Sequence, residues 1–169
     1  MSDSLAQPVD NNQTGRLASI NTSLGGVPKM RVTAAQVSRF GLQNDSQNNK
    51  KLHGGPERAV CVYSLERIRA LQSEGHPIGI GTAGENLTLE GIDWGLVVPG
   101  TKARIGQAVL LEIASFTSPC KTIKNSFREG KFARISEKLH PGWSRVYARV
   151  IKEGEIRVGD TVEIANPWA

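Results

Sequence analysis

The sequence has only two cysteines, Cys61 and Cys120, among 169 residues, which is too few for a scaffold of disulfide bonds. No apolar run approaches the length that crosses a membrane. The N-terminal stretch is polar, with an acidic Asp3, and lacks the pattern of a secretory signal. We therefore expect a cytoplasmic protein without a membrane partner.

Several signatures of bound metals and nucleotides are also missing. The sequence contains no CxxC pair, no HExxH and no phosphate loop ending in Gly-Lys-Ser or Gly-Lys-Thr, so zinc and nucleoside triphosphate sites are not expected. Residues 79–84 match the GxGxxG spacing of dinucleotide sites, but they follow a predicted helix and a proline turn instead of a strand. We interpret them as a flexible loop that leads into a strand over residues 85–90.

Aromatic residues make up only 5% of the chain, whereas the net charge is +5 and the pI is near 9.5. A basic protein suits an anionic partner, such as a phosphorylated cofactor, a nucleotide or nucleic acid. The basic residues are dispersed along the chain and do not alternate with aromatic ones, which weakens the case for nucleic acid.

What the sequence does contain is a series of short apolar segments separated by turn residues. They predict about eight to ten strands and two or three short helices in one domain over residues 16–164. Residues 1–15 are predicted to form a disordered tail and residues 165–169 a short C-terminal tail. Gly-polar turns within residues 104–109 and 157–162 are interpreted as two related hairpins. This pattern favours a mainly β (α+β) fold, a closed β-barrel with a few short helices.

One helix is predicted from Ser64 to about Ser73. Ser64 is a favourable N-cap, and Leu65, Ile68 and Leu71 form one apolar stripe. A second helix is predicted within residues 128–139 from apolar residues at helical spacing.

The main candidate for chemistry is Cys120, which follows a predicted buried strand over residues 109–113. Ser118 is expected to cap a helix and Pro119 to be its first residue, which would place Cys120 in the first turn. The positive end of the helix dipole and the adjacent Lys121 would both favour the thiolate, the form that attacks electrophiles and binds soft metals. Simple packing is an equal alternative from this stretch alone. Cys61 lies in an apolar run and is interpreted as a core thiol.

Three segments, in this order, resemble the MOSC domain, which is also found at the C-terminus of molybdenum-cofactor sulfurases. They are residues 51–60 (KLHGGPERAV), 83–87 (AGENL) and 118–120 (SPC). The resemblance covers residues 16–164 and is to the small stand-alone bacterial members of the YiiM-like type. It implies a MOSC-type β-barrel.

The resemblance also implies a function. The barrel would bind the anionic pterin of the molybdenum cofactor (molybdopterin), with Cys120 as the residue that ligates molybdenum or carries sulfur. Related amidoxime-reducing enzymes reduce N-hydroxylated compounds, and YiiM-like members do this to hydroxylaminopurines. The family is also associated with pyridoxal phosphate. The residues that match its motif positions, and so are implied to bind the cofactor, are His53, Arg58, Glu85 and Asn86. Arg58 is assigned to the anion, and Glu85 and Asn86 to the loop over the metal. Further candidates for the phosphate, from charge and position alone, are Lys121, Lys124 and Arg145.

Three functions therefore stay open. The leading one is a molybdenum-cofactor-binding oxidoreductase that works with an electron-transfer protein. The second is a sulfur carrier that receives a persulfide on Cys120 from a sulfur-donor protein and passes it to a cofactor or a metal-sulfur centre. The third is a basic β-barrel that binds nucleic acid.

Overall fold

Strands dominate the computed structural model, which describes residues 12–46 and 55–165 of the chain. The strands are β1 (Gln13–Thr22), β2 (Met30–Val32), β3 (Ala34–Ser38), β4 (Gly41–Leu42), β5 (Val60–Ser64), β6 (Leu87–Glu90), β7 (Lys102–Ile105), β8 (Val109–Phe116), β9 (Val146–Lys152), β10 (Gly154–Arg157) and β11 (Thr161–Ala165). The helical elements are α2 (Leu65–Ser73) and the short 3-10 helices η1 (Pro56–Arg58), η2 (Trp94–Leu96), η3 (Lys121–Ser126), η4 (Arg128–Gly130) and η5 (Phe132–Ile135). The predicted mainly β class is confirmed.

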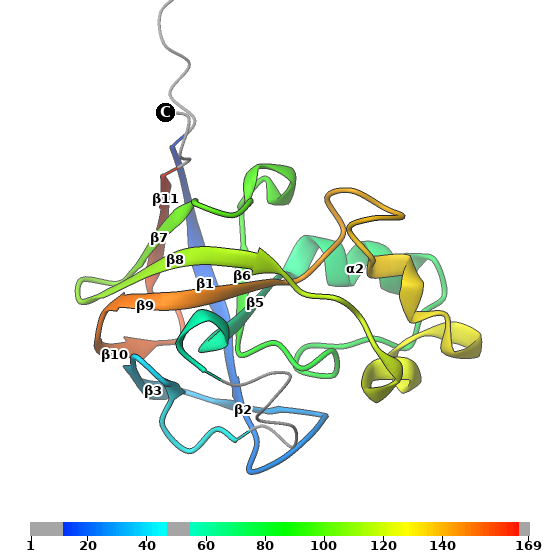
Figure 1. Ribbon diagram of the computed structural model, residues 1–169, viewed down its shortest axis with the longest axis horizontal. Helices are drawn as coiled ribbons and strands as arrows, with labels where there is room; N and C mark the ends of the chain where they lie inside the picture. The colour runs from blue at the N-terminus through cyan, green and yellow to red at the C-terminus, as the bar shows by residue number, and fades with distance from the viewer. Residues whose placement is uncertain (1–11, 47–54, 166–169) are drawn as a thin grey trace, which may run out of the picture.

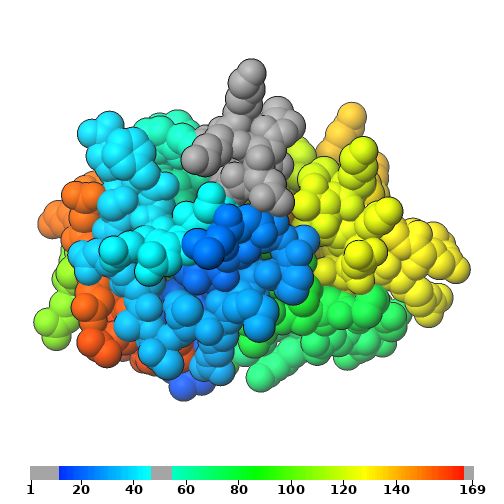
Figure 2. Space-filling view, turned by 90° about the horizontal axis from the view of Figure 1, so that it is seen from below, coloured from blue at the N-terminus to red at the C-terminus, as the bar shows by residue number. Residues whose placement is uncertain are grey.

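Seven of these strands close into a barrel. The order around it is β1-β11-β7-β8-β9-β5-β6, and β6 pairs with β1 again. Neighbouring strands are antiparallel except β5 and β6, which are parallel. β2 pairs with the other end of β1, and β10, β3 and β4 form a second, small sheet below the barrel (Figure 1). Seen from below, blue residues of the N-terminal part of the chain lie between the cyan residues that follow them and the yellow residues of η3 and η4 (Figure 2).

The barrel is filled by side chains that alternate along the strands. In β11, Val162 and Ile164 are buried whereas Thr161, Glu163 and Ala165 are exposed. Burying each large aliphatic side chain contributes about 1.5–3 kcal/mol to the free energy of folding. The face of each strand that carries these side chains therefore points inward. Side chains from other strands that share this interior are Leu17, Ile105, Leu111 and Val146.

Helix α2 lies beside the barrel on the same side as η3 to η5 (Figure 1). Its start is confirmed: Ser64 is the N-cap, and its Oγ accepts a hydrogen bond of 3.1 Å from the backbone N–H of Arg67. The predicted stripe of Leu65, Ile68 and Leu71 is buried. Within the described ranges, no helix has the length and apolar character needed to span a membrane.

The structure corrects several predicted boundaries. β1 begins at Gln13, so residues 13–15 belong to a strand and not to the predicted tail, and Ala165 belongs to β11. Residues 1–11 and 166–169 lie outside the described residues. The chain is divided at Thr33 between β2 and β3, which lie in different sheets.

Only one of the two predicted hairpins is present. Residues 104–109 join β7 to β8, which pair with each other. Residues 157–162 instead join β10 of the small sheet to β11 of the barrel. The reason is that β1 binds this turn, since Leu17 N–H donates to the carbonyl of Asp160 and Gly159 N–H donates to the carbonyl of Leu17, both at 2.8 Å.

The second predicted helix, within residues 128–139, is replaced by η4 and η5. The chain turns at Glu129 and Gly130, where φ is +56° and +67°. These left-handed conformations are incompatible with a continuous right-handed helix.

Candidate functional site at one end of the barrel

Cys120 lies in the segment that leaves the barrel after β8. It is partly exposed, and its thiol donates a hydrogen bond to Thr122 Oγ1 at 3.3 Å. The expected placement in a first helical turn is wrong, because Cys120 is the N-cap of η3 and has an extended backbone. Thr117 N–H donates to the carbonyl of Arg145 at 2.9 Å, which prolongs the pairing of β8 with β9 and keeps the chain from turning at Ser118. Since η3 is a six-residue 3-10 helix, its dipole adds little to the site.

Tyr147, in β9, interacts electrostatically with Cys120, with Cys61 and with two arginines. Burial raises the pKa of Tyr147 to about 12, and the sulfurs of Cys61 and Cys120 act in the same direction, whereas Arg145 and Arg58 lower it. The guanidinium carbon of Arg58 lies 5.7 Å from the centre of the Tyr147 ring. Two cations and two thiols therefore surround a phenol that stays neutral at physiological pH.

Arg145 and Glu85 are buried ionisable residues at this end of the barrel. Arg145 is 6% exposed, and its Nη1 donates to the carbonyl of Ala83 at 2.7 Å. Glu85 is fully buried just before β6. Neither carboxylate oxygen of Glu85, nor Nε of Arg145, has a hydrogen-bond partner within residues 12–46 and 55–165. These are polar atoms that a ligand or water can satisfy.

The buried carboxyl group of Glu85 holds a proton unusually tightly. Burial raises its pKa to about 8, and nearby backbone N–H groups, Arg145 and Lys29 offset only part of this effect. Lys29 is itself buried and pairs with Asp45 at 2.7 Å. Glu85 is therefore mostly protonated at pH 7, so it can donate as well as accept a hydrogen bond.

Asn86, the residue after Glu85, connects neighbouring parts of the backbone through hydrogen bonds. Its Oδ1 accepts from Cys61 N–H at 3.0 Å, and its backbone N–H donates to the carbonyl of Cys61 at 2.8 Å. Its Nδ2 donates to Asp45 at 2.9 Å and to the carbonyl of Asn21 at 3.3 Å. Asn86 thus fastens β5, β1 and the loop around Asp45 to one another. Cys61 is buried as predicted, and burial raises the pKa of its thiol.

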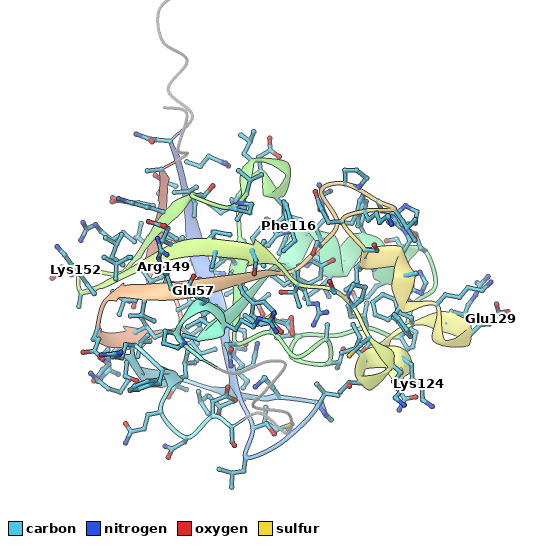
Figure 3. All side chains as sticks on the ribbon, viewed as in Figure 1. Glu57, Phe116, Lys124, Glu129, Arg149 and Lys152 are labelled. Atoms are coloured by element: carbon cyan, nitrogen blue, oxygen red, sulfur yellow. The ribbon has the colours of Figure 1, made fainter. Side chains whose placement is uncertain are left out.

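The structure brings together some of the predicted site residues and separates others. Arg145 and Glu85 interact electrostatically with the Cys61 thiol, and Asn86 accepts from the Cys61 backbone. Arg58 lies over the ring of Tyr147, with which Cys120 also interacts. Lys121 and Lys124 are exposed on η3, and Lys124 points away from the barrel (Figure 3). His53 lies outside the described residues.

Sequence reasoning did not find Lys29 or Tyr147. Lys29 lies in a turn of the chain where a lysine is normally solvated, and its burial depends on Asp45, 16 residues further on. Tyr147 alternates in sequence with the apolar Val146 and Ala148, and no local pattern predicts that β5 pairs with β9 beside it.

The described residues contain no cluster of three or more histidine, cysteine, aspartate or glutamate side chains suited to a metal ion. A metal at Cys120 would therefore have to arrive with ligands of its own, as it does within a cofactor. Among the described residues, Cys120 offers a partly exposed soft thiol.

A closed seven-stranded barrel with a partly exposed thiol and with buried ionisable side chains at one end defines a β-barrel domain with a candidate polar site. The model of the MOSC domain family matches residues 49–163, and the chain belongs to this family. This confirms the resemblance of its three motifs.

Proteins similar to this chain agree with that assignment. YiiM of Escherichia coli is 29% identical over 135 residues, which cover 77% of this chain and 58% of that protein. A reductase of Gibberella moniliformis is 31% identical over 117 residues, which cover 66% of this chain and 20% of that protein. The crystal structure of YiiM from Geobacillus stearothermophilus has a TM-score of 0.67 at 22% identity, covering 89% of this chain and 74% of that one, and it supports the fold. The chain thus matches little more than half of the E. coli relative.

Proposed function

We propose that this protein binds the molybdenum cofactor through Cys120 and acts as an oxidoreductase on N-hydroxylated compounds. The observation that carries the proposal is the partly exposed thiol of Cys120 in a MOSC barrel. Cys120 and two arginines, Arg58 and Arg145, all interact with Tyr147, and buried polar atoms of Arg145 and Glu85 lack partners among the described residues. A thiolate is a soft ligand of the kind that suits a soft metal centre.

The residues at the site fit the cofactor. Arg58 and Arg145 offer guanidinium groups to its phosphate, which guanidinium binds with two parallel hydrogen bonds. Nε of Arg145 is a buried donor and the protonated carboxyl of Glu85 is a buried donor and acceptor, both without a partner in the described part of the chain. A pterin edge carries groups of both kinds. Lys121 and Lys124 are weaker candidates, because both are exposed on η3.

Bound at Cys120, the cofactor would supply two-electron redox chemistry. Reduction of a substrate R–NHOH breaks the N–O bond, consumes two electrons and two protons, and yields R–NH₂ and water. The electrons come from an electron-transfer protein. Tyr147 and protonated Glu85 hold protons at the same end of the barrel, and Glu85 is the one that gives up its proton near neutral pH.

The test is the metal content of the protein made in a host that synthesises the cofactor. We expect about one molybdenum per chain in the wild type and a large loss in Cys120→Ser. The matched control is Cys61→Ser, which removes the other thiol while the contacts of the Cys61 backbone with Asn86 remain. Absence of molybdenum from both the wild type and Cys120→Ser contradicts the proposal.

A sulfur carrier is the second candidate, because Cys120 is an accessible thiol that is not in a disulfide. In that case a sulfur donor transfers sulfane sulfur to the Cys120 thiolate, and the persulfide passes it on to a cofactor or a metal-sulfur centre. Mass spectrometry separates the two functions, since a carrier shows a reducible adduct of one sulfur atom on Cys120 without molybdenum.

A further inference from the structure

The segment that begins at Cys120 carries most of the net charge of the protein. Residues 120–140, which we call the basic lobe, contain six basic and two acidic residues, whereas the whole chain has 21 basic and 16 acidic residues. The basic lobe therefore supplies +4 of the net charge of +5, and the rest of the chain is almost neutral. Its basic residues are Lys121, Lys124, Arg128, Lys131, Arg134 and Lys138. Charge gathered in one region produces a field that attracts an oppositely charged partner.

Most of this charge is not neutralised within the protein. Arg134 pairs with Glu74 at 2.7 Å, and Lys131 pairs with Glu129 at 2.6 Å. The other four basic side chains are exposed and make no ion pair with any residue that the structure describes: Lys121, Lys124, Arg128 and Lys138. Lys124 lies at one end of the molecule and Lys152 at the other (Figure 3). The surplus of positive charge therefore faces outward at one end.

The basic lobe is held against the rest of the fold, so its charges have defined positions. Ile123, Phe127 and Ile135 are buried in the core. Ser126 Oγ donates a hydrogen bond to the carbonyl of Thr82 at 3.0 Å. η3 also packs against η4 and η5. A surface that is ordered before binding engages a partner at a lower entropic cost than a flexible tail of the same charge.

The basic lobe also presents apolar surface. Leu139 is 60% exposed, and Phe132 is partly exposed. Both line a groove of about 420 Å³, together with Lys138 and with residues 116–119. Apolar contacts surrounded by polar and charged ones are typical of protein–protein interfaces. Surfaces for single-stranded nucleic acid instead present several aromatic rings on which bases stack. The lobe thus favours a protein partner.

The basic lobe is continuous with the candidate metal ligand. Cys120 is the N-cap of η3, and its carbonyl accepts a hydrogen bond from Ile123 N–H at 3.1 Å. Its partly exposed thiol donates to Thr122, and both Lys121 and Thr122 are exposed. A protein that contacts these two residues therefore contacts the immediate neighbours of the thiol, where the proposed function requires two electrons.

We propose that the basic lobe is the docking surface for the electron donor, and that this donor is a protein with an acidic face. The inference rests on the proposed function and names the chemistry of its partner. Complementary charges accelerate the encounter of two proteins, and salt screens them. Association should therefore be favourable at low ionic strength and weak at high ionic strength. Contacts between electron-transfer proteins are small, so a single lobe provides enough surface.

Two small electron carriers of opposite charge provide the test. Flavodoxin is strongly acidic, whereas cytochrome c is strongly basic. Binding of each oxidised carrier to the full-length protein without metal is measured by isothermal titration calorimetry at about 20 mM and about 300 mM NaCl, which differ several-fold in screening length. We expect flavodoxin to bind at low salt and at least about tenfold more weakly at high salt, and cytochrome c not to bind.

Charge reversal at matched positions locates the surface. Arg128→Glu combined with Lys138→Glu reverses two exposed charges within the basic lobe. Lys102→Glu combined with Lys152→Glu is the matched control, because it changes the net charge equally at exposed positions outside the lobe. The lobe variant should weaken flavodoxin binding at least about tenfold, and the control less than about threefold. In the metal-loaded enzyme, the lobe variant should raise KM for reduced flavodoxin and leave KM for the N-hydroxylated substrate unchanged.

The outcomes separate the docking surface from the proposed function. Equal binding of the two carriers, no binding of flavodoxin, or an equal effect of the two double variants overturns the docking surface. If an oligonucleotide of about 20 bases binds through the lobe in place of flavodoxin, the lobe is a nucleic-acid surface and the inference is wrong. Molybdenum-loaded protein that flavodoxin reduces equally well with and without the lobe substitutions supports the proposed function alone. Flavodoxin binding that the lobe variant loses, in a protein that never contains molybdenum, supports the docking surface and contradicts the proposed function.

Discussion

Replacing Glu85 by glutamine should remove a pH dependence from the stability of this protein. The carboxyl group is fully buried and its pKa is about 8, against an ordinary value of 4.5. Glutamine has nearly the same shape as the protonated acid but cannot ionise. The substitution therefore changes the charge that folding must bury and little else.

The sign follows from the direction of the shift. A raised pKa means that the folded chain binds the proton more tightly than the unfolded chain does. The contribution of the proton is complete below about pH 4.5 and is lost as the pH rises toward 8. At about 1.36 kcal/mol for each pH unit, the full interval corresponds to about 5 kcal/mol, of which roughly 3 kcal/mol is lost between pH 5 and pH 8.

Other groups that face Glu85 do not obscure this effect. They are the cationic Arg145 and Lys29 and the neutral Cys61 and Tyr63. Burial raises the pKa of both the Cys61 thiol and the Tyr63 phenol, so neither ionises below pH 8. The charge of the surroundings is thus constant over the range of the experiment.

The assay is urea unfolding followed by tryptophan fluorescence at pH 5, 6.5 and 8. The free energy of unfolding of Glu85→Gln should increase relative to that of the wild type by roughly 3 kcal/mol from pH 5 to pH 8, because only the wild type loses stability over this range. Glu163→Gln, at an exposed position in β11, should show no such trend. A constant difference between Glu85→Gln and the wild type across this range would refute the reasoning, because Glu85 would then be ionised at neutral pH.

Three further substitutions test the scaffold. Ser64→Ala removes the N-cap bond to Arg67 N–H and should lower the free energy of unfolding by about 1 kcal/mol, measured by urea denaturation. Asn86→Ala leaves buried backbone groups of β5 and β1 without partners and should cost about 3 kcal/mol, seen as a lower Tm. Gly81→Ala should cost about 3 kcal/mol by the same measurement: a Cβ would lie 2.2 Å from the carbonyl oxygen of Lys29, and φ is +82°. An unchanged Tm in Gly81→Ala would mean that the Lys29 turn moves freely.

The elements that the sequence predicted well are those specified by neighbouring residues. α2 is specified by Ser64 and a stripe of apolar residues at helical spacing. The glycines of residues 79–84 form turns before β6, as expected from the helix and proline that precede them.

The predictions that failed depend on partners distant in the chain. The helix expected at Ser118 does not begin there, because Thr117 pairs with the carbonyl of Arg145. The turn of residues 157–162 is held by Leu17, far away in sequence. Local residue preferences cannot register either contact, because each exists only after the barrel has closed.

The candidate site shows the same division. Cys120, Arg58 and Glu85 were identified through motif residues, and the structure brings Arg58 and Glu85 to the thiol end of the barrel. Lys29 is held at that end by a buried ion pair with Asp45, and no local sequence pattern predicts this pair. Lys124 was chosen for its charge alone and lies on the outside of η3 (Figure 3).

The pairing of β1 with β11 has a consequence for synthesis on the ribosome. β1 leaves the exit tunnel long before β11, and its partner over Gln13–Arg16 is Thr161–Ile164. One edge of the nascent β1 therefore waits until all the other strands of the barrel have been translated before it finds its hydrogen-bond partner, and such late, non-local closure is slow. Until then that edge is open to other unfinished chains, so a chaperone that shields it would raise the yield of folded protein.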